Sequence, residues 1–399
     1  MPPFSTAIRL NPFKGCEGPE GEPVAWSRYG RILSERPNFT LDPLFHAGCY
    51  YVQDSSAMYV GYIFRKYIAV LETGAAKGAS AGSAKCASAG AAEKSSAGAD
   101  GQRGGKGVGP VIRVLDLCAA PGGKTSDLST SLREAFGDNF CLIANEVIKS
   151  RAAALKDNAA RWGDSNVVVT SADPAVFGRN MTGYFDAIIA DVPCSGEGMF
   201  RKSQKAIEDW SPATVDLCAA RQKRILGDVW PALKEGGLLV YSTCTYEDKE
   251  NDDNLEWAAD TLGGEIFRPE NEFAEYGVRL TRHGNLLKAG EVPGEGQWVG
   301  ALRKTAASPV TKKPIIPSPL ALEESDRVLA INYAPEYPVV ELELSDALKY
   351  LHRDALYLPD APKGLIIAAY KSHPLGLAKN LGTRCNNLLP KSRRILMDV

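Results

Sequence analysis

Segments with strand patterns and helix patterns alternate through the middle of the chain, and this alternation limits the fold more than any other feature. Runs rich in Val, Ile and Leu predict strands at residues 111–118, 141–146, 166–170, 185–192, 236–244 and 297–304. Helical patterns lie between them, in a helix that ends at residue 136 and in helices at 149–162, 211–233 and 249–262. Buried strands that alternate with helices indicate an α/β fold, a parallel sheet with helices on both faces. Ligands bind such sheets beyond the carboxyl ends of the strands, so residues that follow strands are the candidates for chemistry.

Two segments of biased composition divide the 399 residues into parts. Residues 74–109 are rich in Ala, Gly and Ser and have no aromatic residue, which predicts a flexible insertion without a core. Residues 305–319 have the Pro, Ser and Lys content of a linker. The predicted parts are an N-terminal extension at 1–70, the α/β domain at 110–304 and a C-terminal domain at 320–399.

The composition argues against several classes of protein. No apolar run is long enough to cross a bilayer, and the N-terminus lacks the basic and apolar regions of a signal peptide. The nine cysteines are widely spaced without a CxxC pair, and the chain has only four histidines. These counts argue against a disulfide framework and against a metal site. We therefore expect a monomeric cytoplasmic protein in a reducing compartment, with no metal and no membrane partner.

Charge is distributed unevenly along the chain. The net charge is −2, yet all the charged residues from Lys363 to Arg394 are Lys or Arg. A basic surface is the footprint of contacts with nucleic-acid phosphates, and the whole-chain charge can hide it. An ordinary solvated basic face is the alternative.

A glycine-containing turn and three acids predict a cofactor site. The turn LDLCAAPGGKT, residues 115–125, follows the first predicted strand of the α/β domain, and its small residues let backbone N–H groups approach a ligand. It matches neither the P-loop nor GxGxxG. Glu146, Asp173 and Asp191 each follow another strand, where a carboxylate can bind a ribose diol or an adenine amino group. A helix cap is the alternative for each acid alone; together they favour a nucleoside cofactor without a triphosphate.

Two cysteines, Cys194 and Cys244, also lie at the ends of strands. A thiolate in such a place can act as a nucleophile. Attack of a thiolate on carbon 6 of a pyrimidine would make carbon 5 nucleophilic enough to accept a methyl group. Chemistry alone leaves open which of the two thiols attacks. Buried structural roles are expected for Cys49, Cys141 and Cys218.

Three motifs carry a resemblance to a known family. LDLCAAPGGKT, ADVPCSGEGMFRK and VYSTCTYEDKEND resemble motifs I, IV and VI of the Sun/Fmu-type RNA (cytosine-5) methyltransferases, in particular the bacterial branch that modifies small-subunit ribosomal RNA. The resemblance implies a Rossmann-like class I methyltransferase sheet with a short N-terminal RNA-binding extension. The tail HPLGLAKNLGTRCNNLLPKSRRI resembles the small PUA-like β-rich RNA-binding domain of that branch.

The resemblance also implies roles for single residues. Cys244 would be the nucleophile, Cys194 would assist product release, and Asp191 would position or protonate the base. The implied ligands of S-adenosylmethionine are Cys118, Ala119, Ala120, Pro121, Gly122, Gly123, Lys124, Glu146, Asp173 and Asp191. The candidate RNA contacts are Arg201, Lys202, Lys379, Arg384, Lys391 and Arg393. The expected partner is 16S ribosomal RNA or the small ribosomal subunit.

Three alternatives compete with this interpretation. The same chemistry on transfer RNA fits the catalytic motifs equally well. A non-catalytic RNA-binding assembly factor would retain the fold, but it would be expected to have lost at least one of the strand-end acids and thiols. An amino-nitrogen methyltransferase uses an Asn/Asp-Pro-Pro-aromatic loop and needs no thiol, whereas this loop reads DVPC, from Asp191 to Cys194.

Overall fold

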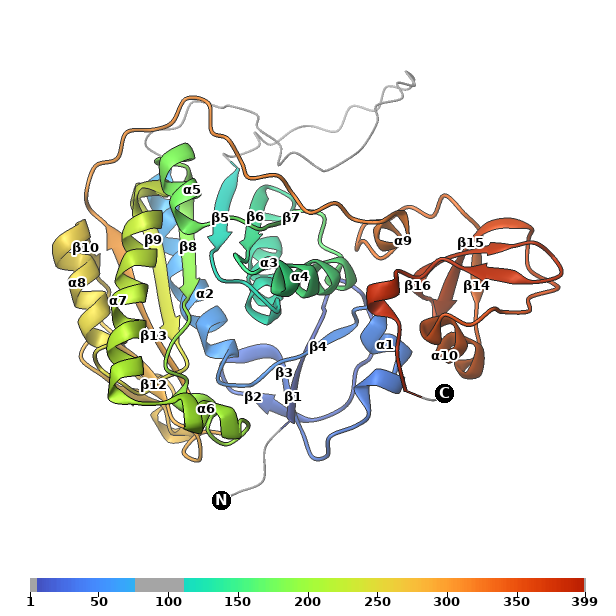
Figure 1. Cartoon of the computed structure of the whole chain (residues 1–399), viewed down its shortest axis with the longest axis horizontal. Coiled ribbons are helices and arrows are strands. Elements are labelled where there is room, and N and C mark those ends of the chain that lie inside the picture. The colour runs from blue at the N-terminus through green and yellow to red at the C-terminus, as the bar shows by residue number, and fades with distance from the viewer. Residues whose placement is uncertain (1–5, 76–110, 398–399) are drawn as a thin grey trace.

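The computed structural model describes residues 6–75 and 111–397, which contain three separate sheets. Most of the predicted insertion at 74–109 therefore lies outside the described residues. Figure 1 shows the N-terminal part in blue between the central α/β domain and the C-terminal domain in red. The predicted fold class, a Rossmann-like sheet with a small N-terminal extension and a β-rich C-terminal domain, is confirmed.

The N-terminal part is an antiparallel sheet followed by one long helix. Its strands have the order β2-β3-β1-β4, and every pairing in it is antiparallel. Its elements are β1 (Thr6–Leu10), β2 (Glu22–Val24), β3 (Ser27–Leu33), η1 (Phe39–Leu41), α1 (Pro43–His46), β4 (Tyr50–Val52) and α2 (Met58–Ala75).

The central domain contains the predicted alternation of strands and helices. Its parallel core comprises β5 (Ile112–Asp116), α3 (Gly123–Phe136), β6 (Phe140–Asn145), α4 (Lys149–Trp162), β7 (Val167–Thr170), α5 (Pro174–Asn180), β8 (Phe185–Asp191), α7 (Pro212–Val229), β9 (Leu233–Thr243) and α8 (Asp252–Leu262). Short elements follow or interrupt it: η2 (Glu197–Met199), α6 (Gln204–Asp209), η3 (Trp230–Ala232), β10 (Gly264–Ile266), η4 (Ala274–Tyr276), β11 (Arg279–Leu280), β12 (Gly284–Leu287) and β13 (Gln297–Lys304). The strand order is β11-β12-β13-β9-β8-β5-β6-β7.

The prediction of a parallel sheet is wrong at one edge. The strand β13 pairs antiparallel with β9, and β10 and β12 pair antiparallel with β13. An antiparallel edge on an otherwise parallel sheet is common, and a buried strand has the same apolar pattern in either direction. The sequence of β13 therefore predicts a strand without predicting its direction.

Neighbouring residues of the central strands face opposite layers of helices. Val114 and Ile189 pack with residues of α2 and α3, whereas Leu115 and Ile188 pack with residues of α5, α7 and α8. This alternation follows from the two-residue period of a strand. It buries both faces of the sheet, which is why its strands are almost entirely apolar.

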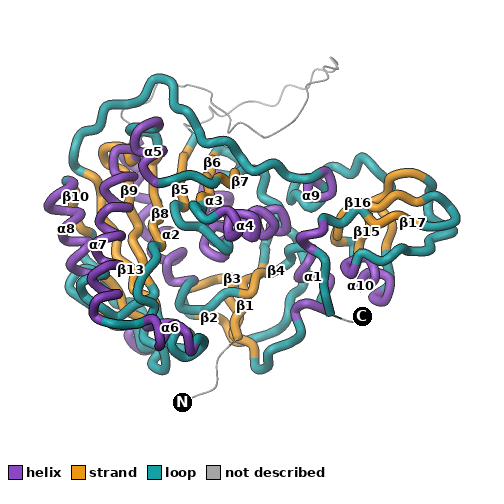
Figure 2. Tube along the Cα trace, viewed as in Figure 1, coloured by secondary structure: helices purple, strands orange, loops and turns teal. Residues whose placement is uncertain are grey.

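The C-terminal domain is a small sheet that shares a core with the N-terminal part. Its elements are α9 (Glu324–Arg327), β14 (Val339–Glu341), α10 (Leu344–His352), β15 (Gly364–Tyr370), β16 (His373–Asn380), β17 (Cys385–Asn387) and η5 (Lys391–Arg393). Ile8 and Tyr50 of the N-terminal sheet belong to the same buried cluster as Tyr350 and Ile366. Figure 2 shows the long loop that connects β13 to α9 across the top of the molecule.

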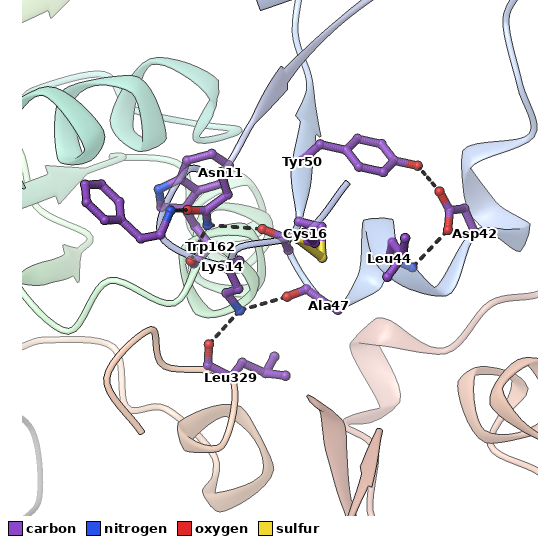
Figure 3. The surroundings of a disulfide bond; sticks show 12 residues. Asn11, Lys14, Cys16, Asp42, Leu44, Ala47, Tyr50, Trp162 and Leu329 are labelled. Carbon is purple, nitrogen blue, oxygen red and sulfur yellow. Dashed lines mark hydrogen bonds between the residues drawn. A yellow bond between two sulfur atoms is a disulfide. The ribbon is translucent and has the colours of Figure 1, made fainter. Parts of the chain in front are cut away.

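The expectation that cysteines would not form disulfides is wrong for Cys16 and Cys49. Cys16 and Cys49 form a disulfide, with Cα atoms 5.7 Å apart (Figure 3). They are separated by 33 residues in the sequence, and the antiparallel pairing of β1 with β4 brings their loops together. Two cysteines 33 residues apart do not by themselves predict a disulfide. Within the described residues, no helix is both long enough and apolar enough to span a membrane.

Candidate active site

The strand order reverses at β5, and the candidate site lies beyond the carboxyl ends of β5 and its neighbours. The strand β5 pairs with β6 on one side and with β8 on the other, while β9 lies next to β8. Asp116 ends β5 and Asp191 ends β8. Open α/β sheets bind ligands at such a reversal, so these residues lie where a ligand site is expected.

The two predicted thiols meet at this edge of the sheet. Cys194 lies in the loop after β8, and Cys244 directly follows β9, the adjacent parallel strand. Their Sγ atoms are 3.0 Å apart, and the backbone N–H of Cys244 donates to the Sγ of Cys194 at 3.3 Å. Both thiols are reduced and only partly buried, whereas Cys218 and Cys385 are buried in α7 and β17.

The contact between the two sulfurs makes the thiols unequal. Their hydrogen bond lowers the pKa of Cys244, and it raises the pKa of Cys194 well above its ordinary value. This corresponds to a Cys194 S–H that donates to a Cys244 thiolate. The Lys124 ammonium also lowers the pKa of Cys244, while burial and the carboxylate of Asp191 raise it. Because the thiolate is the nucleophilic form of cysteine, the electrostatics favour Cys244 as the attacking group.

Asp191 is held firmly beside the thiols. Its Oδ2 forms an ion pair with Lys124 Nζ at 2.9 Å. Its Oδ1 accepts hydrogen bonds from Ser242 Oγ at 2.7 Å and from Gln297 Nε2 at 3.3 Å. Three neighbouring strands, β8, β9 and β13, therefore fix the carboxylate in one orientation, with its side chain still 27% exposed.

Glu197 connects the Cys194 loop to the Cys244 loop. It begins η2, and its carboxylate accepts from Thr245 Oγ1 at 3.0 Å and from the backbone N–H of Tyr246 at 2.8 Å. The backbone N–H of Gly198 also donates to the carbonyl of Cys244 at 2.8 Å. These bonds attach the second loop to the first at the residues that flank its thiol.

Glu250 makes the reciprocal connection from the other loop. It follows Cys244, is fully buried, and accepts from the backbone N–H of Ser195 at 3.1 Å and from Gln222 Nε2 at 2.6 Å. Gln222, on α7, also donates to the carbonyl of Pro193 at 3.0 Å. Two glutamates thus hold the loops from opposite directions, which accounts for the short distance between the sulfurs.

The predicted cofactor turn lies between β5 and α3. Residues 117–122 form a tight loop before α3, in which Gly122 has a φ of 113°, a conformation that favours glycine. Asp116 is buried beneath the loop, and its Oδ2 accepts from Thr125 Oγ1 at 2.7 Å. Its Oδ1 has no hydrogen-bond partner among the described residues. Burial raises the pKa of Asp116 to about 7.

The other two predicted cofactor acids lie at the ends of β6 and β7. Glu146 is buried, accepts from the backbone N–H of Ile148 at 3.0 Å and forms an ion pair with Arg151 at 3.2 Å. Asp173 is the N-cap of α5, where its carboxylate accepts from the backbone N–H of Ala175 at 3.0 Å. Asp173 thus makes the capping contact that was its alternative role, and it still lies on the edge of the sheet where the ligand is expected.

The N-terminal sheet supports the cofactor loop, a contact that was not predicted from the sequence. Arg9 of β1 is fully buried and donates to Gln53 Oε1 at 2.9 Å, to the carbonyl of Gly123 at 3.3 Å and to Ser126 Oγ at 2.5 Å. Its guanidinium also lies 4.5 Å from the ring centroid of Trp162. Because a single arginine near the N-terminus resembles any surface charge, only the folded structure assigns it to the loop.

The candidate RNA contacts near the active site are engaged in ion pairs. Lys202 Nζ lies 3.1 Å from Asp54 and 3.5 Å from Glu295, and Arg201 Nε lies 3.9 Å from Glu295. Both basic side chains thus connect the loop after Cys194 to acids of other segments. This pairing is an alternative to the predicted contacts with RNA phosphates.

The candidate RNA contacts in the C-terminal domain differ in exposure. Lys379, Arg384 and Lys391 are exposed. Arg393 is buried and forms an ion pair with Asp326 at 2.8 Å. The geometry therefore supports three surface contacts in this domain and a structural role for the fourth side chain.

Several residues of the site were missed by reasoning from the sequence. Glu197, Glu250 and Gln297 contact the two thiol loops or Asp191, yet none of them was singled out. Glu197 lies inside the PCSGEG motif and Glu250 inside the acidic stretch after STCT, so their proximity to the cysteines was a usable signal. The sequence around Gln297 has no such signal, because Gln297 lies on β13, more than 50 residues after Cys244, and reaches Asp191 only through the folded sheet.

Comparison with other proteins supports the resemblance over most of the chain. Residues 111–262 match the family described as 16S rRNA methyltransferase RsmB/F. Residues 2–55 match the N-terminal domain of 16S rRNA methyltransferase RsmF, and residues 337–395 match the methyltransferase RsmF PUA domain.

Relatives and solved structures agree with these matches. Proteins named ribosomal RNA small subunit methyltransferase F from Escherichia coli and Shigella sonnei are 38% identical over 205 residues, which cover 51% of this chain and 42% of each relative. The crystal structure of PH0851 covers 76% of this chain and 60% of its own, with a TM-score of 0.58 and 20% identity. A methyltransferase homolog from Pyrococcus horikoshii covers 76% of this chain and 87% of its own, with a TM-score of 0.53 and 24% identity.

The matches to relatives span less than half the length of those proteins, and the solved structures show a shared fold alone. The three family matches nevertheless follow one another in the order N-terminal domain, methyltransferase domain and PUA domain. Across these three parts the chain therefore matches the RsmB/F family of 16S rRNA methyltransferases.

Proposed function

We propose that this protein transfers a methyl group from S-adenosylmethionine to carbon 5 of a cytosine in 16S ribosomal RNA. The observation that carries the proposal is the pair of thiols, 3.0 Å apart beside the fixed carboxylate of Asp191. Amino-nitrogen methylation needs no thiol, whereas methylation at carbon 5 needs a nucleophile for carbon 6. The matches to the RsmB/F family and to the PUA domain favour RNA as the substrate.

The residues of the site suit a covalent route. The Cys244 thiolate attacks carbon 6 of the cytosine, and the electrons of the 5,6 double bond make carbon 5 nucleophilic. Asp191 lies within the same site to hydrogen-bond the base and favour this attack. After carbon 5 has taken the methyl group, loss of its proton restores the double bond and expels Cys244 as a thiolate. Cys194, next to the carbon–sulfur bond, assists this release.

The residues around the cofactor turn fit S-adenosylmethionine, which supplies the methyl group when bound. Gly122 allows the close turn at the N-terminus of α3, and the unpartnered Oδ1 of Asp116 leaves a buried acceptor beneath it. Glu146 and Asp173 supply carboxylates at the next two strand ends. Lys124 does not occupy a phosphate site, because its ammonium forms the ion pair with Asp191.

The RNA must present its base outside a helix to reach these thiols, because base-modifying enzymes act on single-stranded or extruded bases. The exposed side chains of Lys379, Arg384 and Lys391 offer phosphate contacts on the C-terminal domain. Phosphate contacts of this kind give affinity without sequence information.

A methylation assay tests the proposal directly. The purified chain is incubated with S-adenosylmethionine carrying a labelled methyl group and with unmodified 16S ribosomal RNA, and transfer RNA serves as the parallel substrate. We expect labelled 5-methylcytidine in the ribosomal RNA, detected by mass spectrometry of the nucleosides. The matched control is Cys218→Ala, which removes a buried thiol of α7 outside the site and should retain activity. Label in transfer RNA alone would overturn the substrate, and no label in any RNA would overturn the reaction.

A further inference from the structure

Two cysteines and a histidine that take no part in the candidate active site form a cluster of possible metal ligands. Cys16 follows β1, Cys49 precedes β4, and His373 begins β16 of the C-terminal domain. One ligand atom from each of the three lies within 4.8 Å of the other two. Figure 3 shows Cys16 in the loop of the N-terminal part that also holds Lys14.

The three side chains form a donor set that zinc prefers. Zn²⁺ binds cysteine thiolates and histidine nitrogens, and sites with three protein ligands complete a tetrahedron with water. Cys49 is fully buried, while Cys16 and His373 are half-buried, so the cluster is sheltered but reachable. The ring of His373 has no hydrogen bond or ion pair within the described part of the chain, which leaves its nitrogens available to a ligand.

We propose that, when the Cys16–Cys49 disulfide is reduced, Cys16, Cys49 and His373 bind one Zn²⁺ ion. A dithiol or phosphine reductant converts the disulfide into two thiols and is itself oxidised. The ion then displaces one proton from each thiol, so that two Zn–S bonds and one Zn–N bond form and two protons are released. Water takes the fourth position, because no further His, Cys, Asp or Glu among the described residues joins the cluster.

The charge balance of such a site suits its surroundings. Zn²⁺ with two thiolates and a neutral imidazole carries no net charge, so the nearby ammonium of Lys14 does not oppose it. Lys14 Nζ is in addition held by the carbonyls of Ala47 at 2.8 Å and Leu329 at 2.7 Å. The disulfide and the metal site are mutually exclusive states of the same two sulfurs.

The metal would join two parts of the chain that the disulfide does not. Cys16 and Cys49 both belong to the N-terminal part, whereas His373 belongs to the C-terminal domain. The disulfide therefore closes a loop within one part, and the metal site cross-links that part to the PUA domain. This inference does not depend on the proposed methylation.

Cobalt and zinc binding to the full chain tests the inference. The protein is reduced with a phosphine, freed of excess reductant under inert gas, and titrated with Co²⁺, whose thiolate complexes absorb in the near ultraviolet. We expect one equivalent of Co²⁺ with a thiolate band that Zn²⁺ abolishes, and metal analysis that gives one zinc per chain. Cys16→Ser should abolish this band.

His373→Gln separates a metal site from a disulfide, because the imidazole takes no part in the disulfide. We expect this variant to form the Cys16–Cys49 disulfide normally and to bind zinc more weakly by at least about tenfold. The matched control His352→Gln lies in the same domain but outside the cluster, and it should bind as the wild type does. No metal uptake by the reduced wild type, or a thiolate band that persists in Cys16→Ser, would overturn the proposal; the latter result would point to the thiols of the active site.

Discussion

The chemistry of single residues in this site depends on a difference between two neighbouring thiols. Cys194 and Cys244 lie at equivalent places after adjacent strands, yet their hydrogen bond and the position of Lys124 favour a thiolate on Cys244. The backbone N–H of Cys244 points the other way, toward Cys194. We nevertheless propose Cys244 as the nucleophile, because the hydrogen bond from Cys194 and the ammonium of Lys124 both lower its pKa.

The contribution of Lys124 can be measured from thiol reactivity. Lys124→Met removes the ammonium that lowers the pKa of Cys244, so the alkylation of Cys244 in the cofactor-free protein should require a higher pH. Alkylation followed by mass spectrometry of the Cys244 peptide resolves it from Cys194. Lys124→Arg keeps the charge and should keep the wild-type midpoint. An unchanged midpoint in Lys124→Met would show that the hydrogen bond from Cys194 acts alone.

The buried carboxyl of Asp116 predicts a dependence of stability on pH. Its pKa is about 7 in the folded protein, against 3.8 as the ordinary value. The folded state therefore binds a proton that the unfolded state has lost, and the stability that this provides falls as the pH rises from about 4 to about 7. We expect Asp116→Asn to become more stable relative to the wild type as the pH rises, measured by urea unfolding at pH 5 and pH 8. A stability difference that does not change between these values would contradict the raised pKa.

At the scale of elements, the site is assembled by loops that follow three neighbouring strands. Capping residues mark the ends of several helices of this domain. Ser211 is the N-cap of α7, and Gly163 and Gly263, both with positive φ, are the C-caps of α4 and α8. The strands fix the position of each loop, but the sulfur–sulfur distance depends on bonds between the loops.

Glu250 offers a test of this connection. Glu250→Ala leaves the N–H of Ser195 and the amide of Gln222 without their acceptor in a buried place, which costs about 1–3 kcal/mol of the free energy of unfolding. We expect a fall in kcat with little change in the KM for the cofactor, because the thiols move apart while the cofactor turn is untouched. Glu250→Gln keeps one acceptor oxygen and should recover part of kcat. Equal losses in both kinetic constants would indicate general unfolding instead.

The sequence predicted the core strands and the places of the two thiols better than it predicted the residues that hold the thiol loops together. Apolar runs such as that of β8 identify a buried strand. A residue that directly follows a strand, such as Cys244, can therefore be placed at the carboxyl edge of the sheet. The direction of β13 and the pairing of Cys16 with Cys49 depend on contacts between distant segments, which no local pattern records. The burial of Arg393 against Asp326 was missed for the same reason.

At the scale of the whole molecule, the N-terminal sheet connects the other two sheets. It contributes Arg9 to the cofactor loop and shares a buried cluster with the C-terminal domain. A substrate bound across the C-terminal domain would therefore be positioned relative to the thiols through the N-terminal sheet (Figure 1).

Replacing Arg9 should remove the contact between the N-terminal sheet and the cofactor turn. Arg9→Ala leaves Gln53, Ser126 and the Gly123 carbonyl without their buried donor, which should cost on the order of 3 kcal/mol of unfolding free energy. We also expect weaker binding of S-adenosylmethionine by calorimetry, because the cofactor turn loses its support. Arg31→Ala is the control and should change neither quantity substantially, because this side chain of β3 donates to the nearby carbonyls of Arg28 and Gly30. Normal cofactor affinity in a folded Arg9→Ala protein would contradict the support role.

Covalent trapping tests the central claim most directly. The wild type, Cys194→Ala and Cys244→Ala are each mixed with S-adenosylmethionine and unmodified 16S ribosomal RNA and are separated on denaturing gels. If Cys244 attacks and Cys194 assists release, Cys194→Ala accumulates a protein–RNA adduct and Cys244→Ala forms none. An adduct that accumulates in Cys244→Ala and is absent in Cys194→Ala would contradict this assignment and exchange the roles of the two thiols.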